Sequence, residues 1–255
     1  MRDEKAIILA MDQGFEHGPV DFNEENIHPR YVMDIALKEE FTAFACQIGV
    51  ARHYYTKKYR GVPLLIKLNG KTRFDNEDPV SLQHTTVEHA ASIGAKAVGY
   101  TIYLGSTHEQ EMFIEFGRIC EEAHNRGLAA VCWMYPRGPH IKDETDTKTL
   151  AYGARIAMEL GADMVKTKSN GDLGGMKWVV KSAGAAKTVF AGGSLKDDLQ
   201  FLKNAEFALK TGGVGLAVGR NIWQSKHPYL MSEALKQVIF EGVSPDKALK
   251  NVKLE

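Results

Sequence analysis

The sequence predicts a closed (β/α)8 barrel, a TIM barrel in the α/β class, that forms one domain over residues 1–255. Short apolar runs rich in Val, Ile and Ala alternate with longer amphipathic segments along the whole chain. Continuous apolar strands joined through helices indicate parallel pairing, because such strands are buried on both faces. Eight strand–helix units in 255 residues also match the size of this barrel. An open doubly wound sheet is the alternative, and the absence of a GxGxxG motif after the first strand disfavours it.

The individual elements follow from these runs. The apolar runs predict strands at 6–11, 42–48, 63–68, 96–102, 128–133, 163–166, 188–191 and 213–218. The amphipathic segments predict helices at 30–40, 82–93, 109–125, 147–160, 175–183, 195–210 and 227–241, with a shorter one at 51–59. A glycine stands between helix and strand four times, at Gly94, Gly127, Gly161 and Gly212, where a helix needs a left-handed stop.

Composition narrows the class of protein. The formal net charge is zero, which disfavours nucleic acid or a membrane surface as the main partner but allows a phosphorylated small molecule. Three widely spaced cysteines form no disulfide framework, so a reducing cytoplasm is the expected location. No apolar run approaches membrane-spanning length. The nine histidines show no ligand pair with a matched carboxylate, so no metal is expected. We also expect no other cofactor.

A pair of lysines marks the sixth predicted strand. Lys166 and Lys168 share one face of that strand with Met164. A lysine in an apolar interior is either paired with an acid or used as an amine, and a second ammonium nearby would raise the fraction of free amine. We therefore expect a Schiff-base nucleophile here, although strand parity cannot choose between the two lysines. The alternative is a neutralised or solvent-reaching lysine.

Other reactive groups are expected at the same end of the sheet, where active sites of such barrels lie. Tyr135 follows the fifth predicted strand and could transfer protons, or it could be a packed rim aromatic. Trp133 would be a packing platform for a neighbouring group. Asp12 follows the first strand and could be a general base or a lysine partner, although in isolation a turn-capping role is favoured.

The last two strand ends predict a phosphate site. Gly192, Gly193 and Ser194 follow the seventh strand, and Gly219 and Arg220 follow the eighth. Glycines before a helix allow close backbone approach and free N–H groups, and the loops after strands seven and eight are the usual phosphate cradle of this fold. The alternatives are a tight strand–helix turn and, for Arg220, a salt bridge that closes the barrel. Arg137 is a candidate for a second phosphate, with a loop-ordering salt bridge as its alternative.

Five motifs in order, at 11–19, 133–138, 161–166, 191–193 and 217–221, resemble those of the archaeal-type class I fructose-1,6-bisphosphate aldolases, within the wider DhnA-type aldolase group. The resemblance covers nearly the whole chain. It implies a (β/α)8 barrel with metal-independent Schiff-base catalysis. It also implies that Lys166 is the nucleophile, that Tyr135 and Asp12 handle protons, and that Trp133 positions the Schiff base. The phosphate of the ketose would lie on Gly192, Gly193, Gly219 and Arg220. Lys168 is then left as the neighbour whose charge, on the argument above, would tune the amine.

The resemblance further implies a sugar-phosphate substrate and a homo-oligomer, as large as a decamer in this family. Gln13 stands where many relatives carry His and Ser194 where many carry Pro, so details of substrate recognition are open. The related 2-amino-3,7-dideoxy-D-threo-hept-6-ulosonate synthase, of aromatic amino-acid precursor synthesis, is the alternative activity. A non-catalytic phosphate-binding barrel is a third reading, and the intact lysine, tyrosine and aspartate argue against it.

Overall fold

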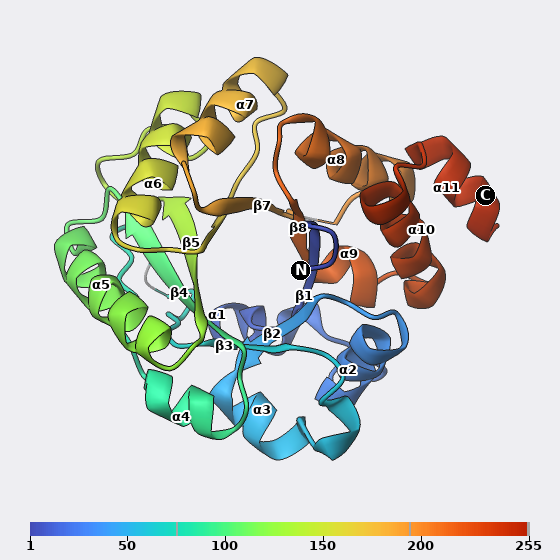
Figure 1. Ribbon diagram of the computed structural model, residues 1–255, viewed down its shortest axis with the longest axis horizontal. Coiled ribbons are helices and arrows are strands. Elements are labelled where there is room, and N and C mark those ends of the chain that lie inside the picture. Colours follow the sequence, from blue (N-terminus) through green and yellow to red (C-terminus); the bar gives the residue numbers. More distant parts are fainter. Residues whose placement is uncertain (75, 194, 254–255) are drawn as a thin grey trace.

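The strands close into a barrel in chain order, with β1 hydrogen-bonded to both β2 and β8. The computed structural model describes residues 1–74, 76–193 and 195–253. All eight strand pairs are parallel and the helices form an outer ring (Figure 1). The strands are β1 Ala6–Ala10, β2 Ala43–Gln47, β3 Leu64–Lys67, β4 Ala97–Leu104, β5 Ala129–Pro136, β6 Met164–Thr167, β7 Lys187–Ala191 and β8 Gly215–Val218. The predicted (β/α)8 barrel is therefore confirmed.

The helices alternate with these strands. The larger ones are α2 Pro29–Lys38, α3 Ile48–Tyr54, α4 Val87–Ser92, α5 Glu109–Asn125, α6 Thr147–Glu159, α7 Leu173–Ser182, α8 Asp198–Lys210, α10 Pro228–Glu241 and α11 Pro245–Val252. Two short helices follow the first and last strands, α1 Gln13–His17 and α9 Arg220–Trp223. Two 3-10 turns, η1 Gly18–Asp21 and η2 Lys57–Tyr59, complete the set. The short helices α1 and α9 and the C-terminal α11 have no counterpart among the predicted elements.

Capping side chains explain where several helices begin later or earlier than predicted. Thr86 accepts a hydrogen bond from the His89 N–H, so α4 starts at 87 instead of 82. Asp197 likewise caps α8, which starts at 198 instead of 195, and Asp172 caps α7. The residues before α4 form a loop that Asn69 holds, because its side-chain amide donates to the Ser81 carbonyl.

The predicted glycine stops are confirmed by backbone geometry. The φ angles are +88° at Gly94, +69° at Gly127, +102° at Gly161 and +90° at Gly212. An L-residue with a side chain seldom adopts this region, so glycine ends each helix there at little steric cost.

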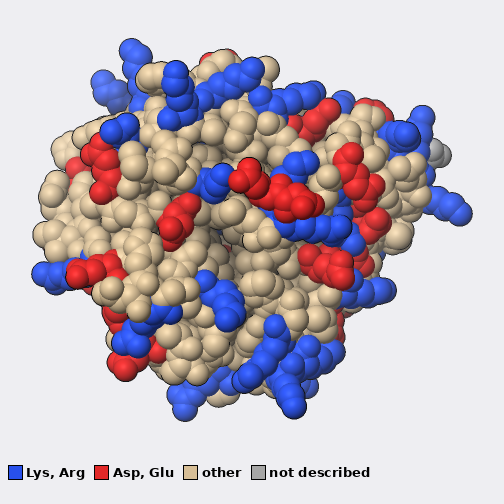
Figure 2. Space-filling view, in the orientation of Figure 1, with Lys and Arg blue, Asp and Glu red and all other residues tan. Residues whose placement is uncertain are grey.

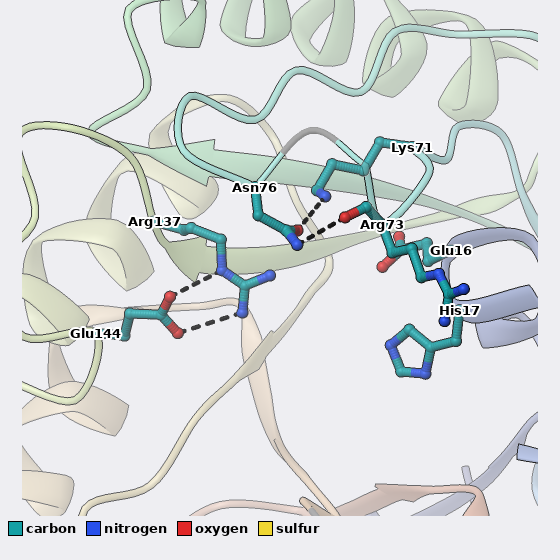
Figure 3. Close-up of a pocket in the computed structure, with 7 residues that line it drawn as sticks. All are labelled: Glu16, His17, Lys71, Arg73, Asn76, Arg137 and Glu144. Atoms are coloured by element: carbon teal, nitrogen blue, oxygen red, sulfur yellow. Dashed lines mark hydrogen bonds and ion pairs between the residues drawn. The ribbon is translucent and has the colours of Figure 1, made fainter. Parts of the chain in front are cut away.

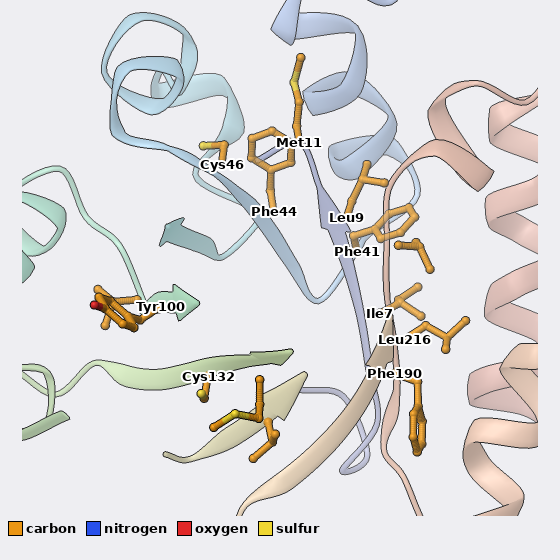
Figure 4. Packing of buried hydrophobic residues seen from close by; sticks show 14 of the residues in the cluster. Ile7, Leu9, Met11, Phe41, Phe44, Cys46, Tyr100, Cys132, Phe190 and Leu216 are labelled. Carbon is orange, nitrogen blue, oxygen red and sulfur yellow. The ribbon is translucent and has the colours of Figure 1, made fainter. Parts of the chain in front are cut away.

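Side chains alternate along each strand between two cores. Outward-facing residues such as Ile7, Leu9 and Phe44 pack against the helices (Figure 4). Inward-facing residues, including Ile8, Leu65 and the rest of a smaller apolar cluster, fill the barrel itself. This two-residue period decides which strand residues can enter a site inside the barrel.

The surface charges are mixed and the cysteines are unpaired, as the zero net charge and the wide cysteine spacing predict. On the face seen in Figure 2, basic and acidic side chains are interspersed. Cys46, Cys120 and Cys132 are all buried free thiols. Within the described ranges no helix combines the length and apolarity needed to cross a bilayer.

Candidate active site

A cavity of about 800 Å³ opens at the carboxyl ends of the strands. Its lining brings together side chains from five strand ends: Asp12, Lys67, Trp133, Tyr135, Lys166 and Arg220. Every predicted catalytic residue thus lies in one cavity, together with Lys67, which the sequence interpretation had not selected.

Lys166 lies on the inner face of β6. Met164, two residues earlier, belongs to the apolar cluster inside the barrel, whereas Val165 belongs to the outer core. The Lys166 side chain is 7% exposed, and its Nζ lies 5.0 Å from the ring centroid of Trp133. Within the described part of the chain no carboxylate approaches Lys166 within ion-pair distance. Burial lowers the pKa of Lys166 most, and the nearby Lys67 lowers it further, although Asp12 and Glu16 oppose both effects.

Trp133 forms the floor beneath the amine. It is buried on β5, and its indole crosses β4 at Gly99. A Cβ at position 99 would lie 2.2 Å from Cζ3 of Trp133, so only glycine leaves room for the ring. The indole therefore packs across β4, with the Lys166 amine over its ring.

Tyr135 also faces the cavity, but from within β5 and not beyond it. The strand extends to Pro136, and Tyr135 pairs in register with Tyr103 of β4. Burial raises the pKa of Tyr135 well above its ordinary value, and the nearby carboxylates of Asp12 and Glu16 raise it further. The phenol is therefore protonated at neutral pH and can donate a proton or a hydrogen bond.

Asp12 occupies the N-cap position of α1, yet its side chain makes no capping hydrogen bond. Its Oδ2 lies 3.9 Å from Nζ of Lys67 instead. Glu16, on α1, approaches the same amine, with Oε1 at 4.0 Å. The position suggested by the sequence is correct, but the capping interaction is not formed, and the carboxylate faces the cavity.

The tuning role expected of Lys168 is corrected by the structure. The chain leaves β6 after Thr167, and Lys168 forms an ion pair with Glu144. Glu144 also binds Arg137, whose Nε lies 2.8 Å from Oε1. The cation that acts on Lys166 is Lys67, at the end of β3.

Arg137 and Glu144 border a second, smaller pocket of about 430 Å³ (Figure 3). Lys71 and Arg73, from the loop after β3, lie on its other side with His17. Arg137 and His17 also line the larger cavity, so the two spaces adjoin. The predicted loop-ordering salt bridge of Arg137 is present, and it stands beside a basic pocket.

The predicted phosphate cradle lies at the ends of β7 and β8. Gly192, Gly193, Gly219 and Arg220 all line the large cavity, and Ser194 lies outside the described residues. Helix α8 begins only at Asp198, so the expected helix N-terminus does not directly follow Gly193. A Cβ at position 219 would lie 2.9 Å from the Ala10 carbonyl oxygen, so the backbone approaches β1 closely there.

Three polar contacts order this cradle. The Asn221 side chain bridges its two loops, because Oδ1 accepts from the Lys196 N–H at 2.9 Å and Nδ2 donates to the Gly192 carbonyl at 3.1 Å. Nη1 of Arg220 lies 3.5 Å from Oδ1 of Asp21, so the alternative salt bridge is also formed. Asn221 was not selected from the sequence, and its position directly after Arg220 was the available signal.

Several buried polar atoms around the cavity have no hydrogen-bond partner among the described residues. They include Nε1 of Trp133, Oγ1 of Thr101 and Nε2 of Gln13. Unpaired buried donors are costly, so a ligand that supplies hydroxyl groups would bind favourably. Over the same described ranges, no group of three or more His, Cys, Asp or Glu side chains could hold a metal ion.

Comparison with known proteins agrees with this geometry. Residues 6–225 match the model of the DeoC/LacD family of aldolases. The chain is 44% identical over 244 residues to the class 1 fructose-bisphosphate aldolase of Thermoproteus tenax, covering 94% of this chain and 92% of the relative. It is 43% identical over 253 residues to the class 1 fructose-bisphosphate aldolase of Halobacterium salinarum, covering 98% and 96%.

Solved structures give the same result. A crystal structure of an archaeal fructose 1,6-bisphosphate aldolase superposes with a TM-score of 0.90 at 44% identity, covering 94% of this chain and 96% of the other. A structure of an archaeal fructose-1,6-bisphosphate aldolase with its catalytic Lys covalently bound to the carbinolamine intermediate of the substrate superposes with a TM-score of 0.89 at 43% identity, covering 93% and 95%. From its sequence and its fold, this chain belongs to the DeoC/LacD aldolase family.

Proposed function

We propose that this protein is a class I fructose-1,6-bisphosphate aldolase that works through a Schiff base on Lys166. The observation that carries the proposal is a buried lysine with a lowered pKa, held over Trp133 beside a protonated phenol. The relatives named as class 1 fructose-bisphosphate aldolases support it. They favour it over the heptulosonate synthase, which shares the lysine, tyrosine and glycine motifs.

The reaction begins with addition of the uncharged Lys166 amine to C2 of the ketose. Loss of water from the carbinolamine gives a protonated imine, which withdraws electrons from the C3–C4 bond. Tyr135 is the group suited to protonate the departing hydroxyl, because its pKa keeps it protonated. Trp133 restricts the orientation of the imine from below.

Cleavage follows when a base removes the proton of the C4 hydroxyl. The C3–C4 bond breaks and glyceraldehyde 3-phosphate leaves. The electron pair of the broken bond moves toward the imine and forms an enamine on Lys166. Protonation at C3 and hydrolysis then release dihydroxyacetone phosphate. Asp12, one of the carboxylates that line the cavity, would accept this proton, with Tyr135 as the alternative relay.

Binding of the two phosphates orients the substrate. The 1-phosphate would lie on Gly192, Gly193, Gly219 and Arg220, where backbone groups and a guanidinium meet. Arg137 would approach the 6-phosphate from the adjoining basic pocket. Holding both ends converts binding energy into alignment of C2 against the amine. The unpaired donors of Trp133 and Gln13 suit the sugar hydroxyls that lie between the two phosphates.

Borohydride trapping tests the proposal. The protein is incubated with fructose 1,6-bisphosphate and borohydride, and the adduct is located by peptide mass spectrometry. We expect a reduced adduct on Lys166, none in Lys166→Arg, and triose-phosphate release unaffected by EDTA. An adduct on Lys168, or loss of activity with EDTA, would contradict the mechanism. An adduct without triose-phosphate release would favour the synthase.

We also propose that residues 1–255 act as one domain that assembles as a homo-oligomer in the cytoplasm. Tyr152 on α6 is 64% exposed, and Trp178 and Leu173 on the neighbouring α7 are 57% and 40% exposed. Such side chains are commonly covered by a partner. Free buried thiols suit a reducing compartment. Light scattering should give a mass several times that of the chain, up to a decamer, and Trp178→Asp should reduce it.

A further inference from the structure

Two buried lysines share one aromatic ring in the cavity. Nζ of Lys67 lies 5.3 Å from the Trp133 ring centroid, and Nζ of Lys166 lies 5.0 Å from it. Lys67 is the more deeply buried of the two, at 1% exposed against 7%. The proposed mechanism gives Lys166 the covalent step and leaves Lys67 without a role.

The surroundings of Lys67 compensate a positive charge. Oδ2 of Asp12 lies 3.9 Å from its Nζ and Oε1 of Glu16 lies 4.0 Å from it, and the indole face adds a cation–π contact. A charge-assisted hydrogen bond is about 2.7–2.9 Å long, so both contacts are longer than direct bonds. The ammonium group is therefore held between two carboxylates and bonded tightly to neither.

Lys166 is in the opposite situation. Across the described residues it has no carboxylate within 4.0 Å, although Asp12 and Glu16 act on it electrostatically. A carboxylate paired directly with this amine would favour the ammonium form, which cannot attack a carbonyl. The two acids at the cavity mouth are paired with Lys67 instead.

We propose that Lys67 is a positioning residue for the reaction. It holds Asp12 and Glu16 on the β3 side of the cavity and so keeps the Lys166 amine unpaired and nucleophilic. Lys67 acts through Lys166 and the two acids without forming a bond to the substrate. This inference rests on the proposed role of Lys166 as the Schiff-base lysine.

The electrostatics of the cavity point the same way. After burial, Asp12 raises the pKa of Lys166, Lys67 lowers it and Glu16 raises it. Tyr135, on the adjacent β5, stays protonated because burial raises its pKa. On the other side, β7 places the apolar Val189 in register with Lys166. Other titratable groups near this cluster include Tyr103, whose pKa burial raises, and His84, whose pKa burial lowers. The buried thiols of Cys46 and Cys132 and the guanidinium of Arg137 also lie near it.

Removing Lys67 should therefore make Lys166 more basic. The carboxylates would lose their partner and the like charge would disappear, so the amine would bind its proton up to a higher pH. We expect the acid limb of imine formation to move up by roughly one pH unit in Lys67→Met, a tenfold loss near the limb that recovers at high pH. Lys67→Arg keeps the charge and should keep most of the wild-type limb.

The experiment measures the rate of borohydride trapping of dihydroxyacetone phosphate on Lys166 against pH. Wild type, Lys67→Met and Lys67→Arg are compared in the full chain, with Lys58→Met as a surface-lysine control that also loses an Asp partner, Asp34. The double variant Lys67→Met/Glu16→Gln removes one charge of each sign. The acid limb of trapping in this double variant should return toward that of wild type. The double variant also keeps the proposal testable if Lys67→Met does not fold.

The outcomes are distinguishable. A uniform loss in Lys67→Met at every pH, with the limb unmoved, would overturn the positioning role in favour of direct substrate binding or a structural role. An equal shift in Lys67→Arg would also overturn it, because the charge is retained there. If wild type gives no adduct on Lys166, the proposed function itself fails, whatever the variants show.

Discussion

The two ends of the barrel interior differ in chemistry although the same strands build both. Lys67 stands two positions after Leu65 on β3, and Lys166 stands two positions after Met164 on β6. The lower member of each pair belongs to the apolar cluster inside the barrel, and the upper member lines the cavity. One step along the same face therefore passes from residues of the apolar interior to residues that line the cavity and are proposed to serve the reaction.

The difference shows how the fold tolerates buried amines. The apolar layer inside the barrel and the outer core beneath the helices stabilise the structure independently of the cavity. Trp133 separates the layers, and its ring contacts both lysines from below. The upper layer is thus expected to supply activity at some cost in stability. The lower layer is expected to stabilise the fold without taking part in the reaction.

Lys166→Met is the sharpest test of this contrast. Loss of the nucleophile should reduce kcat/KM by about 10³-fold or more, because the proposed imine can no longer form on Lys166. The variant should also be more stable than wild type, since folding no longer places an amine in a site that disfavours its charge.

The stability gain has a definite pH dependence. The pKa of Lys166 is lowered in the folded state from 10.5, so the unfolded chain binds more protons between the folded value and 10.5. Wild-type stability therefore rises with pH across that window. The advantage of Lys166→Met in thermal unfolding should be largest at lower pH and vanish above about 10.5. An advantage that is independent of pH would contradict the burial of an ionisable amine.

Tyr135→Phe should have the next largest effect on activity. It removes the phenolic proton from the upper layer and keeps the ring, so kcat should fall about 10²- to 10⁴-fold. Borohydride trapping on Lys166 should persist at a slower rate, because the amine is untouched. Trapping and turnover that both match wild type would exclude Tyr135 as the proton donor.

The strand faces and strand ends that carry the site residues could be predicted from the sequence. Because Met164 and Lys166 share parity on one short apolar strand, the inner face of β6 was identifiable before the fold was known. The ends of β1, β5 and β8 followed in the same way, which located Asp12, Tyr135 and Arg220 at one rim. These inferences require only local pattern and the rule that parallel strands end together.

Contacts between distant segments were not predictable. Lys168 is the nearest lysine to Lys166 in sequence, but it pairs with Glu144 on the loop after β5. Lys67 acts on Lys166 only because the barrel closes and brings β3 to the same indole. The predicted first residues of two helices were wrong for a different reason. Thr86 and Asp197 are ordinary residues until their side chains cap α4 and α8.

Met164→Ala tests the lower layer from the same strand. Truncating this buried side chain should cost about 2–5 kcal/mol of unfolding free energy. In a chain of this size the melting temperature should fall by on the order of 10 °C. Activity at moderate temperature should stay within a few-fold of wild type, because Lys166 remains above Trp133. A loss of kcat comparable to that of Tyr135→Phe, in protein that is still folded, would mean that the two layers are not separable.

Lys168→Met should have the smallest effect. It also distinguishes the role of Lys168 from that of Lys166, which strand parity could not do. Burial acts to raise the pKa of Glu144, but hydrogen bonds from Arg137 and Lys168 hold it below its ordinary value. Arg137 remains after the substitution, so the lost pair should cost at most about 1 kcal/mol of stability. The acid limb of trapping on Lys166 should not move, in contrast to Lys67→Met. A limb that moves in Lys168→Met and not in Lys67→Met would return the tuning role to Lys168.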